Sequence, residues 1–186
     1  MNRKYMPALI LTLFAVGTMR AANPEVVIET SYGSITVELF VDKAPISVKN
    51  YLQYVDDKHF DGTIFHRVIE NFMIQGGGFE PGMKERKSRE AIKNESTNGL
   101  LNKRGTIAMA RTGDPDSATA QFYINVVDNA DLDRRGTNAG YCVFGRVKEG
   151  MDVVDKIRKV KTADARGHES VPVEDIAIKS VRRAKK

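Results

Sequence analysis

An arginine stands inside an apolar stretch of this sequence, where an unpaired charge would be unfavourable. The stretch is Phe65-His66-Arg67-Val68-Ile69, and Phe72-Met73-Ile74-Gln75 follows it closely. In a β-strand, Arg67 would point to the same side as Phe65 and Ile69. The residues alone leave two interpretations open: a structural arginine held by a salt bridge or extended to the surface, or a guanidinium placed to act on a bound molecule.

The neighbours of this arginine are equally ambiguous. Phe72 and Met73 are ordinary core residues by type, and Gln75 could simply satisfy a backbone group. His66 is better explained as a hydrogen-bonded structural histidine than as a catalyst, because its parity in the strand is opposite to that of Arg67. Residue type therefore marks the segment as a candidate site without deciding its chemistry.

Several common chemistries are missing from the sequence. Its three histidines (His59, His66 and His168) and single cysteine do not form a cluster with metal-ligand spacing. Gly76-Gly77-Gly78 lacks the Lys-Ser/Thr pair of a phosphate loop, and there is no Gly-x-Ser-x-Gly hydrolase motif. The lone Cys142 lies in an apolar run and is interpreted as a core residue. We therefore expect no bound metal and no cofactor.

The elements that must position these residues are mostly short strands. Residues 26–40 alternate around a turn and predict a β-hairpin. Residues 45–55, with Pro45 suited to a first helical turn, and the segment after Gly150 have apolar residues at helical spacing. Further short strands are expected at 64–65, 72–74, 106–110, 122–127, 141–147 and 173–181. The segment 78–104 is expected to be a long solvated loop, and the many short strands favour a barrel or a sandwich.

The first 22 residues are typical of a segment that directs export. Two basic residues precede an uncharged apolar run, 5–19, and small residues follow at Ala21-Ala22. We predict a signal peptide at 1–22 and a single domain at 23–186; an uncleaved leader that anchors the protein to a membrane is the alternative. Without the leader the chain has 26 basic and 24 acidic residues, so we expect no nucleic-acid partner.

Five short blocks, in order along almost the whole chain after the leader, together resemble the cyclophilin family. They are FHRVI at 65–69, FMIQGG at 72–77, GTIAMA at 105–110, QFYI at 121–124 and VFGRV at 143–147. The resemblance implies a mainly β fold, a closed eight-stranded antiparallel β-barrel capped by two α-helices. It also implies a peptidyl-prolyl cis/trans isomerase. The details are most similar to exported cyclophilins of Gram-negative bacteria, which implies a periplasmic enzyme that assists the folding of exported proteins.

The resemblance also implies roles for individual residues. Arg67 takes the place of the catalytic arginine. Gln75 and Gln121 would bond the substrate backbone, and Ala110 and Arg111 would border the groove through main-chain contacts. The other substrate-binding positions are those of the proline pocket and its edge: Phe72, Met73, Tyr123, Leu132 and Tyr141. The implied partners are proline-containing polypeptides, bound by a monomer.

Two positions depart from the family pattern. Asp131 stands where many members have tryptophan or another aromatic residue, which predicts weak binding of cyclosporin. Tyr123 replaces the more usual phenylalanine of the pocket floor, so its hydroxyl needs a partner if it is buried, or else it narrows the pocket. The alternative to an isomerase is a proline-recognising binding module or chaperone with little turnover, which needs the pocket but not Arg67.

Overall fold

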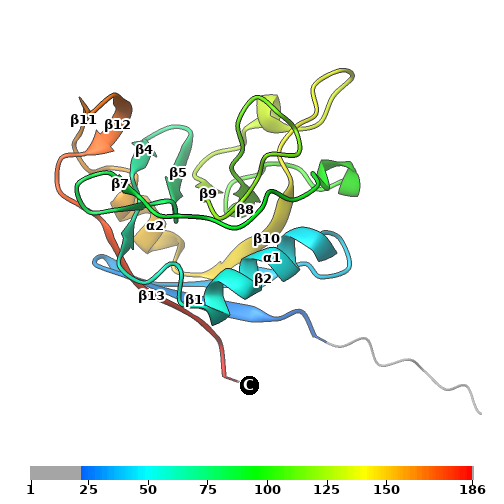
Figure 1. Cartoon of the computed structure of the whole chain (residues 1–186), viewed down its shortest axis with the longest axis horizontal. Coiled ribbons are helices and arrows are strands. Elements are labelled where there is room, and N and C mark those ends of the chain that lie inside the picture. The colour runs from blue at the N-terminus through cyan, green and yellow to red at the C-terminus, as the bar shows by residue number, and fades with distance from the viewer. Residues whose placement is uncertain (1–21, 186) are drawn as a thin grey trace, which may run out of the picture.

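The computed structural model describes residues 22–185, so the predicted signal peptide lies almost entirely outside the described residues (Figure 1). The helices are α1 (Pro45–Asp56) and α2 (Met151–Ile157), with short 3-10 helices η1 (Ser96–Asn98) and η2 (Ala130–Leu132). The strands are β1 (Glu25–Thr30), β2 (Gly33–Leu39), β3 (Thr63–Ile64), β4 (Arg67–Ile69), β5 (Met73–Gly76), β6 (Phe79–Glu80), β7 (Lys84–Glu85), β8 (Thr106–Met109), β9 (Phe122–Asn125), β10 (Val143–Glu149), β11 (Thr162–Ala165), β12 (His168–Pro172) and β13 (Ala177–Arg183). Within this described range, no helix has the length and apolar character that a membrane crossing requires.

Nine strands form one antiparallel sheet whose two end strands are neighbours along the chain. The hydrogen-bonded order is β3-β13-β1-β2-β10-β8-β9-β5-β4. Only Phe65 and His66 separate β3 from β4, so the backbone itself joins the edges of the curled sheet. Taken as one interrupted strand, β3 and β4 give the eight strands of the predicted barrel, and the predicted fold class is confirmed.

The strands carry apolar residues on both faces because they pack against two separate clusters. Phe122 and Ile124 of β9 belong to the main core, while Tyr123 between them belongs to a smaller cluster on the opposite face. The same alternation puts Ile74 of β5 in the main core and Met73 in the smaller cluster. Because the main core fills the curled sheet, the second cluster places apolar side chains on the outside of the barrel.

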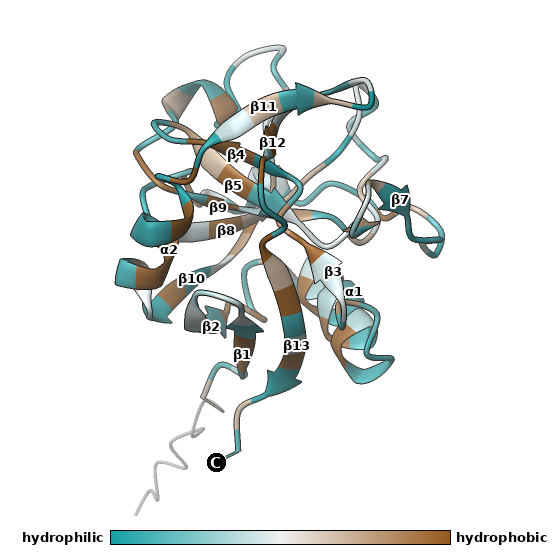
Figure 2. Cartoon of the chain, turned by 90° about the vertical axis from the view of Figure 1, so that its left-hand side faces the viewer, coloured by the Kyte–Doolittle hydropathy of each residue, from teal (hydrophilic) through white to brown (hydrophobic). Residues whose placement is uncertain are grey.

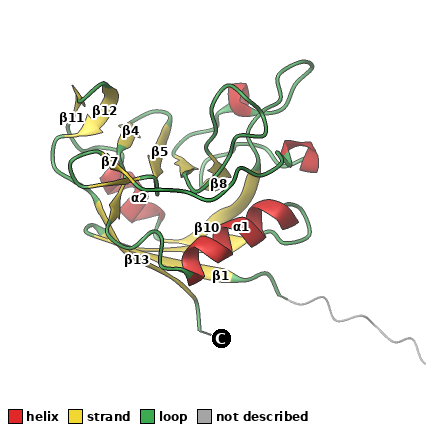
Figure 3. Cartoon of the chain, in the orientation of Figure 1, coloured by secondary structure: helices red, strands yellow, loops and turns green. Residues whose placement is uncertain are grey.

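Both helices pack on the main core, and they stand apart from each other in Figure 3. Helix α1 begins at Pro45, as predicted. Its first turn is capped from a distant loop, because the Glu95 carboxylate accepts hydrogen bonds from the backbone N–H groups of Ile46 and Ser47 at 3.0 and 2.8 Å. The side chains that it buries recur at the predicted helical spacing and include Val48, Tyr51, Leu52 and Val55.

Helix α2 also begins where the sequence predicts, immediately after Gly150. This glycine has a φ of 92°, in the left-handed region that glycine adopts without strain. A Cβ at this position would collide with the carbonyl oxygen of Ser34. Glycine is therefore required both for the turn into α2 and for the close approach to β2.

The expectation that Phe65 and Arg67 share one side of a strand is wrong. The backbone leaves the strand at Phe65 and His66, so the two-residue periodicity does not continue through them. Phe65 is fully buried in the main core, with its ring 6.0 Å from that of Phe122. Ile69 instead packs on the outer cluster, and Arg67, on the same side of β4, faces outward with it.

The other predicted strands have bounds that differ by a few residues, and the largest differences are at the last strand and in the expected loop. The last strand runs from Ala177 to Arg183 rather than over 173–181, and the hairpin β11–β12 precedes it. The composition of β11–β12 is polar, so it gave no strand signal. In Figure 2 apolar and polar residues follow one another in short runs along β13. The expected loop 78–104 contains β6, β7 and η1, and it buries Asn102 at 1% exposure.

Candidate active site

A pocket of about 110 Å³ lies on the outer face of the barrel. Strand β4 contributes one of its lining residues, β5 two and β9 one, and the others come from loops and η2. Nine of the ten site residues predicted from the sequence line it: Arg67, Phe72, Met73, Gln75, Ala110, Arg111, Tyr123, Leu132 and Tyr141. The fold therefore brings together residues that are spread from position 67 to position 141 of the chain.

The central row of the pocket follows from the strand register. Arg67 of β4 is paired with Gln75 of β5, and Gln75 is paired with Tyr123 of β9. Residues paired in this way across neighbouring strands point to the same face of a sheet. Ala108 of β8 continues the row opposite Tyr123 and is fully buried in the outer cluster. A cation, an amide and an aromatic ring are thus placed side by side by backbone pairing alone.

The tenth predicted residue, Gln121, lies beside the pocket rather than in it. Its Oε1 accepts a hydrogen bond from Nε2 of Gln75 at 2.9 Å. Both glutamines also line a neighbouring hollow of about 350 Å³, together with Ala110 and Arg111. A Cβ at Gly78 would collide with the Gln121 side chain, so a larger residue there would displace this amide. The two glutamines form the polar edge of the pocket.

The hydroxyl of Tyr123 has a buried hydrogen-bond partner. It donates to Oδ1 of Asn102 at 2.8 Å, and neither residue is more than 4% exposed. Burial raises the pKa of Tyr123 well above its ordinary value, with a smaller contribution from Tyr141. The hydroxyl therefore remains a neutral donor, engaged with the protein interior. Of the two outcomes that the sequence left open for Tyr123, the structure gives the satisfied hydroxyl.

Arg111 lines the pocket, and its side chain is held in place by several contacts. Its guanidinium lies over the ring of Tyr141, 4.3 Å from the centroid. Nε donates to the carbonyl of Gly140 at 3.1 Å, and Nη1 donates to the carbonyl of Thr112 at 2.8 Å. Tyr141 in turn packs edge-on against Tyr123, with ring centroids 5.9 Å apart. This wall is held by stacking and by main-chain hydrogen bonds.

Arg67 brings an unneutralised charge to the pocket. Its side chain is half-buried, and no aspartate or glutamate lines the pocket. In the part of the chain that the structure describes, Arg67 forms no salt bridge. The interpretation of this arginine as half of a structural ion pair is thereby removed. Its guanidinium hydrogen atoms are available to a bound molecule.

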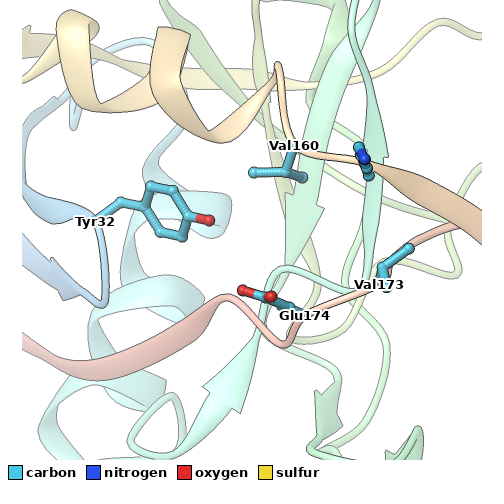
Figure 4. Close-up of a pocket in the computed structure, with 5 residues that line it drawn as sticks. Tyr32, Val160, Val173 and Glu174 are labelled. Atoms are coloured by element: carbon cyan, nitrogen blue, oxygen red, sulfur yellow. The ribbon is translucent and has the colours of Figure 1, made fainter.

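A second hollow of about 220 Å³ contains none of the predicted site residues. It is lined by Tyr32, Val160, Lys161, Val173 and Glu174 (Figure 4). The side chains of Tyr32 and Glu174 point toward each other across it in Figure 4. These residues come from the β1–β2 turn, the segment after α2 and the β12–β13 connection. The hollow lacks the row of paired strand residues that organises the first pocket.

Comparison with known proteins identifies the family. Residues 25–183 match the family described as cyclophilin type peptidyl-prolyl cis-trans isomerase/CLD. The chain belongs to the cyclophilin-type peptidyl-prolyl cis-trans isomerases. This cyclophilin is 57% identical to peptidyl-prolyl cis-trans isomerase B of Escherichia coli over 159 residues, which cover 84% of the chain and 97% of the relative. It is 46% identical to peptidyl-prolyl cis-trans isomerase A of Dickeya dadantii over 190 residues, with the whole of both chains covered.

The fold of this cyclophilin is also similar to that of a solved family member. The crystal structure of a cyclophilin type peptidyl-prolyl cis-trans isomerase from Cryptosporidium parvum gives a TM-score of 0.73 at 25% sequence identity. The match covers 88% of this chain and 99% of the other. Sequence and fold thus agree on the family, and the protein is a peptidyl-prolyl cis/trans isomerase.

Three residues that the sequence singled out lie outside the cyclophilin pocket. His66 is 4% exposed and packs its ring against Phe79, with centroids 4.6 Å apart. Cys142 is a buried free thiol, and burial raises its pKa to about 11, so it is unreactive at neutral pH. Asp131 is exposed in η2 and does not line the pocket. Weak cyclosporin binding stays a prediction.

The sequence analysis missed the polar residues that hold the pocket from behind. Asn102, Asn125, Asn129 and Asp133 are all buried and hydrogen-bonded to one another or to pocket residues. Asparagine and aspartate are common in turns, so their types gave no sign of burial. The one available signal was Tyr123, whose hydroxyl called for a partner.

Proposed function

We propose that Arg67 accelerates rotation about X–Pro bonds by donating a hydrogen bond to the proline nitrogen. Amide resonance opposes this rotation with a barrier of about 20 kcal/mol. As the bond twists, the nitrogen regains its lone pair and becomes a hydrogen-bond acceptor. The guanidinium is always protonated, so it donates more strongly to the twisted amide than to the planar one and lowers the barrier. This chemistry breaks no bond and needs no general base.

The observation that carries this proposal is an unpaired guanidinium at an apolar pocket. Phe72, Met73 and Tyr123 supply apolar surface for a proline ring, and such surroundings strengthen the hydrogen bond from Arg67. The adjacent glutamine pair suits the main chain of a bound polypeptide. A cyclophilin of Cryptosporidium parvum was solved in the presence of the dipeptide Ala-Pro. Proline-containing polypeptides, bound by a monomer, are therefore the proposed substrates.

A protease-coupled assay on an Ala-Pro peptide tests the role of Arg67. We expect Arg67→Ala to lower kcat/KM on the order of 100-fold, the usual effect of removing a donor to the transition state. Arg67→Lys keeps the charge but loses the planar fork, so it should recover only part of the activity. The matched control is Arg146→Ala, which removes an exposed arginine paired with Glu38 on the barrel surface. Wild-type kcat/KM in Arg67→Ala would contradict the proposal.

The same assay distinguishes the proposed function from that of a binding module or chaperone without turnover. That function requires the apolar pocket but gives Arg67 no task. If wild type and Arg67→Ala both left the peptide at its uncatalysed rate while binding it equally, the protein would recognise proline without isomerising it. We expect instead that Arg67→Ala keeps most of the peptide affinity and loses turnover.

We also propose that the protein is exported to the periplasm and assists the folding of envelope proteins. The basic residues, apolar run and small residues of the first 22 positions support export, and the Dickeya dadantii relative aligns over the whole chain. Uncatalysed prolyl isomerisation takes tens to hundreds of seconds and can limit folding. The amino-terminal mass of the protein from a periplasmic fraction should show a chain that starts near Asn23. An intact chain in the membrane fraction would support an uncleaved anchor, and an intact chain in the cytosol would refute export.

A further inference from the structure

Four buried polar residues form a network behind the pocket of this cyclophilin. They are Asn102, Asn125, Asn129 and Asp133, with exposures of 1%, 0%, 8% and 4%. None of them lines the pocket. Buried polar groups are unfavourable unless they are hydrogen-bonded, so a network of this size in a small domain calls for a physical reason.

Asn102 is the centre of the network and is held at both ends of its side chain. Its Oδ1 accepts hydrogen bonds from the Tyr123 hydroxyl at 2.8 Å and from Nδ2 of Asn125 at 3.2 Å. Its Nδ2 and its backbone N–H both donate to Oδ1 of Asp133, at 3.1 and 2.7 Å. The acceptor offered to Tyr123 is therefore fixed in position before any substrate binds.

The network also reaches the other apolar walls of the pocket. Asp133 directly follows Leu132, so the bond to Asn102 fixes the backbone next to that pocket residue. The carbonyl of Asn102 accepts from the backbone N–H of Asn129 at 2.8 Å, and Nδ2 of Asn129 donates to the carbonyl of Phe72 at 2.8 Å. The side chain and backbone of Asn102 are thus linked to three pocket residues, Tyr123, Leu132 and Phe72.

We propose that Asn102 is a positioning residue of the isomerase, which keeps the hydroxyl of Tyr123 out of the proline-binding surface. The inference rests on the proposed binding of proline in this pocket. With its hydroxyl engaged, Tyr123 presents only its ring to the substrate, as a phenylalanine would. Without the Oδ1 of Asn102, the hydroxyl lacks its acceptor, and a water or the hydroxyl itself makes the pocket floor polar. Proline binding then weakens, while the guanidinium of Arg67 keeps its place.

The test is Asn102→Ala in two backgrounds, wild type and Tyr123→Phe. In the wild-type background we expect KM for an Ala-Pro peptide to rise about tenfold, equivalent to about 1.4 kcal/mol, with kcat within about twofold. In the Tyr123→Phe background no hydroxyl has to be held, so the same substitution should raise KM less than about threefold relative to its own parent. Equal KM ratios in both backgrounds would overturn the proposal, because a purely structural loss does not depend on the hydroxyl.

Two further variants separate positioning from simple destabilisation. Thr30→Ala removes a buried hydroxyl at the distant β1–β2 turn, where it donates to the carbonyl of Gly33, and it should lower Tm without changing KM. If Asn102→Ala does not fold, Asp133→Ala removes the anchor of Asn102 and is measured in the same two backgrounds. The KM ratio should again be larger with Tyr123 present, and equal ratios refute the inference.

Peptide affinity measured by calorimetry tests the role of Asn102 without relying on turnover. Its result can therefore be separated from the test of the proposed mechanism. Absent turnover in wild type would refute the proposed function, whereas the ratios of Kd for the same variants would still report on Asn102. A tenfold loss of affinity that depends on Tyr123 supports the positioning role. A loss that is independent of Tyr123 refutes it even if the enzyme is active.

Discussion

At the scale of single residues, the pocket combines one available charge with one concealed hydroxyl. Arg67 has no carboxylate beside it in the pocket, while Tyr123, two strands away in the same row, directs its hydroxyl to Asn102. Gln75 stands between them and is bound to Gln121. The pocket therefore presents an unpaired cation, together with an amide and a ring that are each held by a hydrogen bond to a neighbouring residue.

His66, the residue before Arg67, makes stability depend on pH. Burial, reinforced by the nearby charges of His168 and Arg67, lowers the pKa of His66 to about 4. The unfolded value is about 6.5, so between these values the unfolded chain binds a proton that the folded protein does not. The free energy of unfolding therefore falls as the pH falls through this range, by about 2 kcal/mol between pH 7 and pH 5.

The variant His66→Leu tests this pH dependence. Urea unfolding of wild type and variant at pH 7 and pH 5 should show that the loss of stability on acidification is about 2 kcal/mol smaller in the variant. Because the change in unfolding free energy between the two pH values is compared in wild type and variant, the contributions of all other titrating groups cancel. An unchanged loss in His66→Leu would mean that this histidine is already protonated, or already exposed, in the folded protein.

At the scale of elements, short strands hold Arg67 only because other segments support them. Strand β4 has three residues and, among residues 22–185, pairs only with β5. Behind it, the ring of Phe79 lies between those of His66 and His168, with centroid distances of 4.6 and 5.2 Å. The hairpin that carries His168 thus packs on the segment that carries Arg67.

Helix α1 depends in a similar way on a residue far away in sequence. Its N-cap residue, Ala44, has no side-chain oxygen, and the cap comes from Glu95, which also accepts from the Ser47 hydroxyl at 2.7 Å. Glu95→Ala should lower the free energy of unfolding by about 1–2 kcal/mol, the usual cost of losing a cap. The kcat/KM of the folded protein should not change, because neither α1 nor Glu95 lines the pocket.

The matched control for Glu95→Ala is Glu90→Ala in the same loop. Glu90 is exposed, so its loss should leave stability within about 0.5 kcal/mol of wild type. Urea unfolding of the two variants, with the isomerase assay alongside, gives the comparison. Equal effects of both substitutions would show that the capping bonds contribute nothing measurable.

At the scale of the whole molecule, the barrel closes through its last strand. Strand β13 pairs with β1 on one side and with β3 on the other. It buries Ile178 and Val181 completely in the main core. Arg182 and Arg183 add ion pairs to Asp61 and Asp56, which are at the surface and contribute little singly. Strand pairing and burial are therefore the main contribution of the carboxyl-terminal segment.

Two truncations separate these contributions. Deletion of residues 184–186 should leave the unfolding transition nearly unchanged, because it removes only residues beyond β13. Deletion of residues 177–186 should abolish cooperative unfolding, since it exposes the edges of β1 and β3 and opens the core. Circular dichroism with urea unfolding of both proteins checks this. A cooperative transition in the longer deletion would show that β13 is dispensable for closure.

An element of the fold could be predicted when the residues that indicate it are close together in the sequence. The hairpin over 26–40 and the helix after Pro45 were found because periods of two and 3.6 residues are visible in neighbouring positions. The hairpin β11–β12 was missed because its polar residues carry no such period. Nine of the ten candidate site residues line one pocket, since five sequence blocks in register indicate a family and hence a shared arrangement.

The sequence by itself thus determined the alternating strands, the two helices and the family, because these follow from residue types at short spacing or from motifs in a fixed order. Only the tertiary structure decided that Phe65 turns inward while Arg67 faces outward, because the strand breaks between them. It also decided that Glu95 caps α1 and that Asn102 holds the hydroxyl of Tyr123. The reason is physical: both contacts join residues that are distant along the chain, and only the packing of the barrel brings them within hydrogen-bond reach.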